Sequence, residues 1–157
     1  MNAINNITIR KAEAADLTQV YALIKELAIF EKAPEQPSIS IEKFIQEGTA
    51  KNPRYYVLVA ETENDIVGIA LYYYGYSSWK GSMLYLDDLV VKETHRKLGI
   101  GKLLMDEIIN IAKEEKINLV KWQVLNWNEN AINFYKKYPV VFDDEWINVK
   151  IEKEHLK

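Results

Sequence analysis

The sequence predicts one mixed α/β domain (α+β in some classification schemes), with a mainly antiparallel central sheet flanked by helices. Segments with apolar residues at three- and four-residue steps stand before and after a central region rich in β-branched and aromatic residues. Turn-forming pairs divide that central region into pieces of strand length. The 157 residues, 48% of them hydrophobic, suffice for one compact core and leave little length for a second. We therefore expect residues 1–157 to form a single domain.

The N-terminal part predicts a short strand followed by two helices. The strand is expected around Ile7 to Arg10, and apolar residues from Leu17 to Ala28 follow at helical spacing, with Asp16 suited to the helix start. The segment with Pro34 and Pro37 cannot continue that helix. Ser40 can cap a second helix over Ile41 to Glu47.

The middle of the chain predicts three antiparallel strands. They are expected over Tyr55 to Glu61, Ile66 to Tyr76 and Met83 to Val91, because these stretches are rich in residues that favour strands. Asn64-Asp65 and Lys80-Gly81 are the turn signals between them.

The C-terminal third predicts a crossover and two closing elements. Helical spacing returns from Gly99 to Glu115, and Leu119 to Leu125 is typical of a strand that would run parallel to the preceding one. A further helix is expected over Glu129 to Tyr138, before Pro139, and a last strand over Trp146 to Ile151.

Composition restricts the classes of function. The net charge of -3 and the pI near 5.5 argue against a nucleic-acid-binding face, so a small cationic molecule is the better partner. The absence of cysteine excludes a disulfide framework, a thiolate metal site and a cysteine acyl-enzyme, and no metal is expected. No segment has the length and apolarity of a membrane span and the N-terminus has no targeting pattern, so a cytoplasmic protein is expected. The tyrosines between Tyr72 and Tyr76 are assigned to core and dimer packing.

The loop from His95 to Lys102 is a candidate anion site. Gly99 and Gly101 let the backbone turn and approach a ligand, and the first amides of the following helix lack partners within that helix. Arg96, Lys97 and Lys102 add positive charge. The alternative is a glycine-assisted turn before a surface helix. The glycine spacing fits neither a P-loop nor a dinucleotide-binding fingerprint.

A second candidate lies on the helix predicted after the crossover. Asn128, Ala131 and Tyr135 are separated by three and four residues and so face one side of a helix, where a ligand could meet all of them. The alternative is that Tyr135 packs as a core aromatic beside Phe134 and Tyr138.

These two motifs, in this order, resemble the signatures of the GNAT superfamily of N-acetyltransferases. Arg96, Gly99 and Gly101 match its Q/R-x-x-G-x-G/A loop, and the N-x-x-A-x-x-x-Y pattern from Asn128 to Tyr135 is similar to its second signature. The resemblance implies that the loop binds the pyrophosphate of acetyl-CoA and that the end of the preceding strand pairs with the pantetheine. The residues thereby implied to bind acetyl-CoA are Leu89, Val90, Val91, Arg96, Lys97, Leu98, Gly99, Ile100, Gly101, Lys102, Asn128, Ala131 and Tyr135.

Further stretches are similar to the diamine acetyltransferase group, and within it to the thialysine-acetylating branch. They include Phe30-Glu31-Lys32 and Tyr76 to Gly81. The resemblance implies transfer of an acetyl group to the primary amine of a small diamine, polyamine or thialysine-like amino acid, and a homodimer. Two departures from the family pattern are Asp87 in place of glutamate and Tyr138-Pro139-Val140 in place of a glycine.

The resemblance, with the chemistry of amine acetylation, also assigns roles. An alkylamine of pKa about 10.4 must lose a proton before it can attack a thioester. Asp87 is predicted to receive that proton, either directly or through water. Neighbours on a strand face opposite sides, so only one of the two aspartates should face the site, and the motif selects Asp87; Asp88 is expected to be solvated or paired. Tyr135 is the predicted general acid, and a backbone N–H near Leu89 the donor to the thioester oxygen.

The predicted acceptor site consists of Phe30, Glu31, Ser77, Trp79 and Asp87. Glu31 could hold a second amino group, with aromatic walls from Phe30 and Trp79, or could be a solvated charge at a helix end. Two other functions stay open: an acetyltransferase acting on protein lysines or N-termini, and a CoA-binding module without catalysis.

Overall fold

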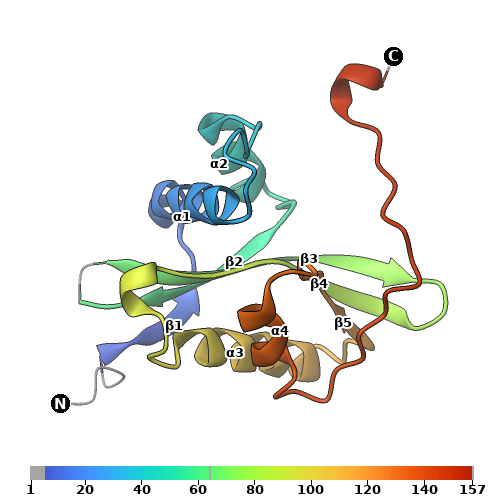
Figure 1. Cartoon of the computed structure of the whole chain (residues 1–157). Helices are drawn as coiled ribbons and strands as arrows, with labels where there is room; N and C mark the ends of the chain where they lie inside the picture. The colour runs from blue at the N-terminus through green and yellow to red at the C-terminus, as the bar shows by residue number, and fades with distance from the viewer. Residues whose placement is uncertain (1–5, 64, 157) are drawn as a thin grey trace. The chain divides into compact units, whose positions relative to one another are not determined.

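The computed structural model describes residues 6–63 and 65–156, and it confirms the mixed α/β fold (Figure 1). The chain divides into two compact units, Met1–Trp122 and Gln123–Lys157, which are described separately. The first contains a five-stranded sheet in the order β1-β2-β3-β4-β5. Asn64, half of one predicted turn, lies outside the described residues.

The sheet has the predicted mixture of strand directions. Antiparallel pairs join β1 (Thr8–Lys11), β2 (Tyr56–Glu61), β3 (Ile66–Ser77) and β4 (Gly81–Val91), and β5 (Leu119–Lys121) runs parallel to β4. The strand predicted to reach Leu125 ends at Lys121, because β5 pairs with β4 only where Met83–Tyr85 faces Leu119–Lys121.

Helices cover both faces of this sheet (Figure 1). The helices α1 (Leu17–Phe30) and α2 (Ile41–Gly48) lie on one face, and α3 (Ile100–Glu114) lies on the other. Ser40 caps α2 as predicted, since its hydroxyl accepts a hydrogen bond from the Lys43 N–H at 3.2 Å. The core on the α1 face combines residues of α1 and α2 with Val57, Val59, Ile69, Leu71 and Val90 of the sheet. Burial of these apolar side chains holds α1 over β3 and β4.

The second unit contains a short helix, α4 (Glu129–Tyr135). The prediction that this helix continues to Tyr138 is wrong, because the residue before Pro139 disfavours the α conformation and the chain leaves the helix in a tight turn, with the Tyr138 N–H donating to the Tyr135 carbonyl.

The predicted last strand, Trp146 to Ile151, is also wrong. The structure has no strand over these residues, and Ile147 and Val149 are 88% and 90% exposed. Alternating apolar residues give a segment one face for burial, but a strand also needs a neighbour for its backbone N–H and C=O groups.

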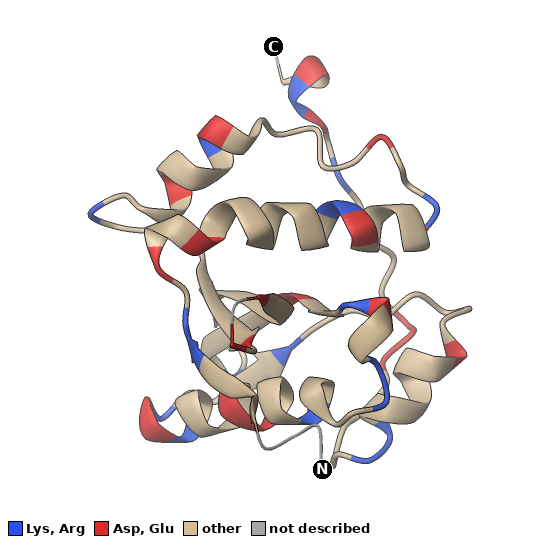
Figure 2. Ribbon diagram, turned by 90° about the vertical axis from the view of Figure 1, so that its left-hand side faces the viewer, with Lys and Arg blue, Asp and Glu red and all other residues tan. Residues whose placement is uncertain are grey.

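Positively and negatively charged residues are interspersed along the helices and loops (Figure 2). Within α1, for example, Lys25 is followed directly by Glu26. No helix in the described part of the chain is long and apolar enough to cross a membrane.

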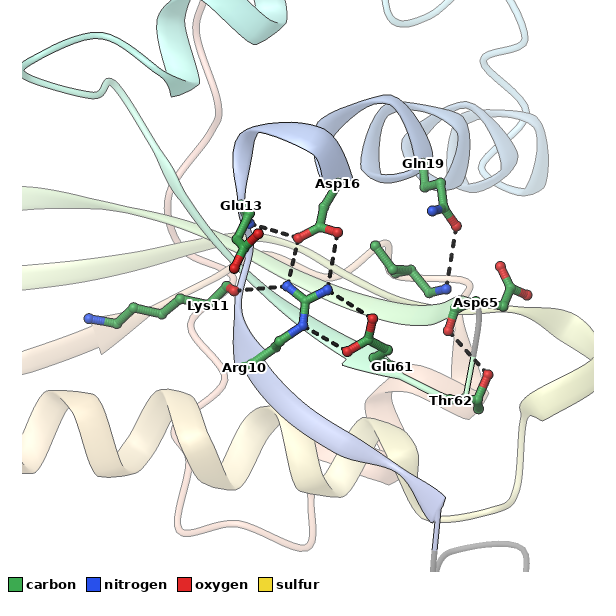
Figure 3. Close-up of polar contacts among 9 residues, drawn as sticks. Arg10, Lys11, Glu13, Asp16, Gln19, Glu61, Thr62 and Asp65 are labelled. Atoms are coloured by element: carbon green, nitrogen blue, oxygen red, sulfur yellow. Dashed lines mark hydrogen bonds and ion pairs between the residues drawn. The ribbon is translucent and has the colours of Figure 1, made fainter.

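Arg10 joins the first strand to the second strand and to the start of α1 (Figure 3). Its guanidinium donates to both carboxylate oxygens of Asp16, at 2.6 and 3.1 Å, and to both of Glu61, at 2.8 and 3.0 Å. These hydrogen bonds lower the pKa values of both carboxyl groups below their ordinary range. Because Asp16 is buried, its charge depends on this partner.

We expect Arg10→Gln to lower the free energy of unfolding at pH 7 by about 1–3 kcal/mol, because Asp16 would remain buried without its cation. The carboxyl pKa values are lowered on folding, so the stabilisation is present above the unfolded pKa of about 4 and is lost as the pH falls through the folded values. Urea unfolding at pH 7 and pH 3 measures both effects, and the difference between variant and wild type should shrink in acid. Arg54→Gln, at an exposed arginine, is the matched control. An equal loss in both variants would contradict the role of Arg10.

Candidate functional site

A β-bulge in β4 places two carboxylates on the same face of the sheet. In the β3–β4 ladder Leu71 is opposite Asp88 and Tyr72 is opposite Leu86, so Asp87 is an extra residue with none opposite it. Asp88 shares the α1 face with Leu71, because residues opposite one another in a ladder point to the same side.

The position of Tyr85 shows that the side chain of Asp87 lies on the same face. Tyr73 lies two residues beyond Leu71 on β3, and its ring stacks on that of Tyr85, directly opposite, with centroids 5.1 Å apart. Asp87 follows Tyr85 by two residues and therefore also points to the α1 side. The expectation that only one of the two aspartates faces the site is wrong, because the bulge interrupts the alternation on which it depends.

The end of α1 brings a third carboxylate to this face. The helix ends in a Schellman motif, in which the Lys32 N–H donates to the Ile29 carbonyl and the Ala33 N–H to the Ala28 carbonyl. Lys32 has a positive φ of 63°, which turns the chain directly after Glu31. This turn fixes Glu31 and Phe30 at the helix end.

The electrostatics show that the three carboxylates are close enough to interact. Burial raises the pKa of Asp88 to about 7, with further contributions from the negative charges of Asp87 and Glu31. Burial also raises the pKa values of Asp87 and Glu31, and for Glu31 the charge of Asp87 adds to the effect. Tyr73 and Tyr85 have raised pKa values too, mainly through burial and partly through Asp87. The cluster Glu31, Asp87 and Asp88 therefore favours a cationic ligand and can accept a proton near neutral pH.

One edge of β4 next to this cluster has no strand beside it in the described structure. The Lys92 N–H donates to Val67 of β3, so the backbone groups of Val91 and Leu89 point to the opposite edge. The Val91 carbonyl accepts a hydrogen bond from Arg96 Nε at 3.2 Å on that side. Of the three residues predicted to pair with an extended ligand, Leu89 and Val91 have the required direction, whereas Val90 is buried and directs its backbone to β3.

The predicted anion loop leads from this edge into α3. Gly99 is the N-cap of α3 with φ 81°, and it has no side chain that could cap the first-turn amides. Lys97 also has a positive φ, of 62°, and together with Arg96 it is exposed. The buried Ile100 fixes the start of the helix against β3, where a Cβ at Gly68 would lie 3.1 Å from its Cγ2. The amides that follow Gly99 are therefore held in place and open to an anion.

The remaining loop residues differ in their surroundings. Arg96 also lies over the ring of Phe30, with its Cζ 5.3 Å from the centroid, so the loop contacts the end of α1. Lys102 forms an ion pair with Asp106, one turn further along α3. Leu98 and Gly101 are half-buried.

Two predicted acceptor residues lie at the far end of the same strands. Ser77 is opposite Gly81 at the turn between β3 and β4, where its hydroxyl accepts hydrogen bonds from the Trp79 and Lys80 N–H groups. Asp87 is six residues along β4 from Gly81, which corresponds to about 20 Å of strand. Within one protomer Ser77 and the 83% exposed Trp79 are thus separate from the carboxylate cluster.

The second motif forms the start of α4. Asn128 is the N-cap, and its side-chain oxygen accepts a hydrogen bond from the Ala131 N–H at 3.2 Å. This explains part of the N-x-x-A pattern, because asparagine is a favoured N-cap residue. Tyr135 is the last residue of the helix, with the ring of Phe134 5.2 Å from its own.

Sequence reasoning gave Asp88 no functional role. The two adjacent carboxylates in a strand were the available signal, but the bulge that turns both to one face arises from the register with β3. Among the described residues no group of three or more His, Asp or Glu side chains could hold a metal ion.

Comparison with known proteins identifies relatives of the chain. The model of the acetyltransferase (GNAT) family matches residues 17–138. The chain is 36% identical over 138 residues to thialysine N-epsilon-acetyltransferase from Bos taurus, covering 83% of this chain and 81% of the relative. It is 32% identical over 160 residues to the protein of that name from Mus musculus, covering 95% and 94%. An aminoglycoside acetyltransferase from an uncultured soil metagenomic sample, solved in complex with trehalose, has the same fold, with a TM-score of 0.78, 21% identity, and coverage of 94% and 97%.

Proposed function

Because the chain belongs to the GNAT family of acetyltransferases, we propose that this enzyme transfers the acetyl group of acetyl-CoA directly to a primary amine of a small molecule. The observation that carries the proposal is the carboxylate cluster Glu31, Asp87 and Asp88, which lies beside an open strand edge that leads into an anion-binding helix start. A cationic acceptor and an anionic donor would be attracted to neighbouring places. We also propose that residues 1–157 act as one acetyltransferase domain.

The donor would use the open edge and the loop. Leu89 and Val91 offer backbone groups for pairing with the pantetheine, and the amides after Gly99 offer hydrogen bonds to the pyrophosphate, with charge from Arg96 and Lys97. The resemblance that assigns Asn128, Ala131 and Tyr135 to the same donor is carried over as part of this proposal.

The chemistry needs a proton acceptor for the ammonium and a proton donor for the leaving thiolate. The carboxylate cluster supplies the first, and the exposed carboxyl group of Asp87 would attract the cation. Tyr135 supplies the second, because a phenol with a reference pKa of about 10 can protonate a thiolate as it leaves. The Leu89 N–H, directed to the open edge, would donate to the thioester oxygen.

For the acceptor we propose thialysine, a diamine or a polyamine. The curated relatives named above acetylate thialysine by their names, and Glu31 would hold a second amino group, with Phe30 beside it. Ser77 and Trp79 lie too far along the strands to contact the same amine, so in the homodimer that we propose they would serve the site of the second copy.

A CoA-thiol release assay tests this function over a panel of thialysine, lysine, spermidine, spermine and lysine-containing peptides. We expect small amines to raise thiol release at least tenfold above the amine-free rate. Faster release with peptides would favour a protein acetyltransferase. Binding of acetyl-CoA by calorimetry without release on any amine would favour a CoA-binding module and contradict the proposal.

A further inference from the structure

The bulge in β4 gives the two adjacent aspartates different surroundings on one face. Asp88 takes part in the β3–β4 ladder opposite Leu71 and is half-buried, whereas Asp87 is the extra residue and is exposed. When one of two neighbouring carboxylates is more buried than the other, the buried one binds a proton more readily. We therefore expect the exposed carboxylate to bind a cationic ligand and the more buried one to accept its proton.

The groups around Asp88 favour its protonated form. Asp87 on its own strand and Glu31 at the end of α1 both repel its negative charge. Tyr73 on β3 and Tyr85 on β4 border Asp87 on the same face and carry no charge near neutral pH. The cations on these elements include Arg96, which lies over Phe30 and donates to the Val91 carbonyl, and Lys32, which follows Glu31 directly in the sequence. Burial and two like charges thus act together, and the pKa of Asp88 is raised to about 7.

We propose that Asp88 is the residue that accepts the proton of the acceptor ammonium, while Asp87 remains ionised and holds the cation. This rests on the proposed function and deepens it. A general base is most effective when its pKa lies near the working pH, because it is then largely unprotonated and still binds a proton well. An ordinary aspartate is unprotonated at neutral pH but binds a proton too weakly.

The ammonium N–H bond breaks and its proton joins a carboxylate oxygen of Asp88, which leaves a neutral amine. The amine lone pair forms the N–C bond to the acetyl carbon, and the C–S bond breaks with its electron pair on sulfur. A second N–H proton, relayed through Tyr135, ends on the thiol. Asp88 then releases its proton to solvent, so the net reaction of ammonium and thioester yields amide, thiol and one free proton.

The test is the pH dependence of kcat/KM from pH 5 to 9 for wild type, Asp88→Asn and Asp87→Asn, with the fastest amine of the panel. Wild type should show an acidic limb with a midpoint near pH 7. Asp88→Asn should remove this limb and lower kcat about 100-fold or more. Asp87→Asn should keep the limb, shift its midpoint to lower pH because one repelling charge is gone, and act mainly on KM.

The reverse pattern, in which Asp87→Asn removes the limb and Asp88→Asn only shifts it, would overturn the assignment and leave the acetyltransferase proposal intact. Wild type without transfer to any amine would overturn both. A folded Asp88→Asn protein should bind acetyl-CoA like wild type. It should also be more stable than wild type above pH 7, and this difference in stability should vanish toward pH 4. The reason is that the Asp88 carboxyl has a higher pKa in the folded than in the unfolded protein, so ionisation of this group destabilises the folded state and protonation removes the effect.

A titration that does not need the Asp88→Asn protein keeps the proposal testable if that variant does not fold. Carboxyl ¹³C NMR titration should find one aspartate with a pKa near 7 that falls in Asp87→Asn and in Glu31→Gln. Ordinary aspartate titration throughout would overturn the proposal.

Discussion

Replacement of Tyr135 by phenylalanine is expected to lower kcat by a factor of about 10²–10³ with little change in the affinity for acetyl-CoA. The phenol is the proposed proton donor to the leaving thiolate, and general acid catalysis contributes factors of this size. Phenylalanine keeps the ring that lies beside Phe134 at the end of α4 and removes only the hydroxyl. Steady-state kinetics with calorimetric titration of acetyl-CoA measure both quantities.

Tyr138→Phe is the matched control for this variant. Tyr138 follows α4 closely and its ring also lies beside that of Phe134, with centroids 5.7 Å apart, so the same chemical change is made in similar surroundings. We expect its kcat to stay within about twofold of wild type. Equal turnover of Tyr135→Phe and wild type would remove Tyr135 from the mechanism.

Substitution of Gly99 by alanine is expected to weaken acetyl-CoA binding about tenfold or more and to destabilise the fold. Gly99 has φ 81° at the N-cap of α3, and a side chain there costs about 1–2 kcal/mol in this left-handed conformation. Relief of that strain would move the first-turn amides away from the positions that an anion needs. Calorimetric titration with acetyl-CoA and urea unfolding measure the two effects.

The variant Gly101→Ala distinguishes an effect on acetyl-CoA affinity from an effect on folding stability, because we expect the two to change in opposite directions. Gly101 lies inside the first turn of α3 without a positive φ, so alanine should stabilise the helix by up to about 1 kcal/mol. Its Cβ should still hinder the close approach of a phosphate to the backbone, and we expect weaker binding in a more stable protein. Binding as tight as in wild type in both glycine variants would place the pyrophosphate elsewhere.

Sequence alone was sufficient for the elements whose signals are local. The cap of α2 by Ser40, the long helix after Gly99 and the parallel crossover strand follow from side-chain type and spacing over a few residues. The anion loop is local as well, because Gly99 supplies the left-handed turn within the motif itself.

Other features depend on partners distant in the sequence. The bulge at Asp87 arises where β4 pairs with β3, so the alternation rule placed Asp88 on the wrong face. The length of β5 depends on how far it pairs with β4, and Trp146 to Ile151 alternates like a strand but is paired with no described strand. The separation of Ser77 from the carboxylates likewise follows from the length of the β3–β4 hairpin.

The most direct test of the account is the fate of a labelled acetyl group. With [1-¹³C]acetyl-CoA and the best amine of the panel, mass spectrometry and NMR should find one acetyl group on the amine nitrogen for each CoA thiol released. Thiol release without N-acetylated amine, or label that accumulates on the protein itself, would contradict direct acetyl transfer to a small amine.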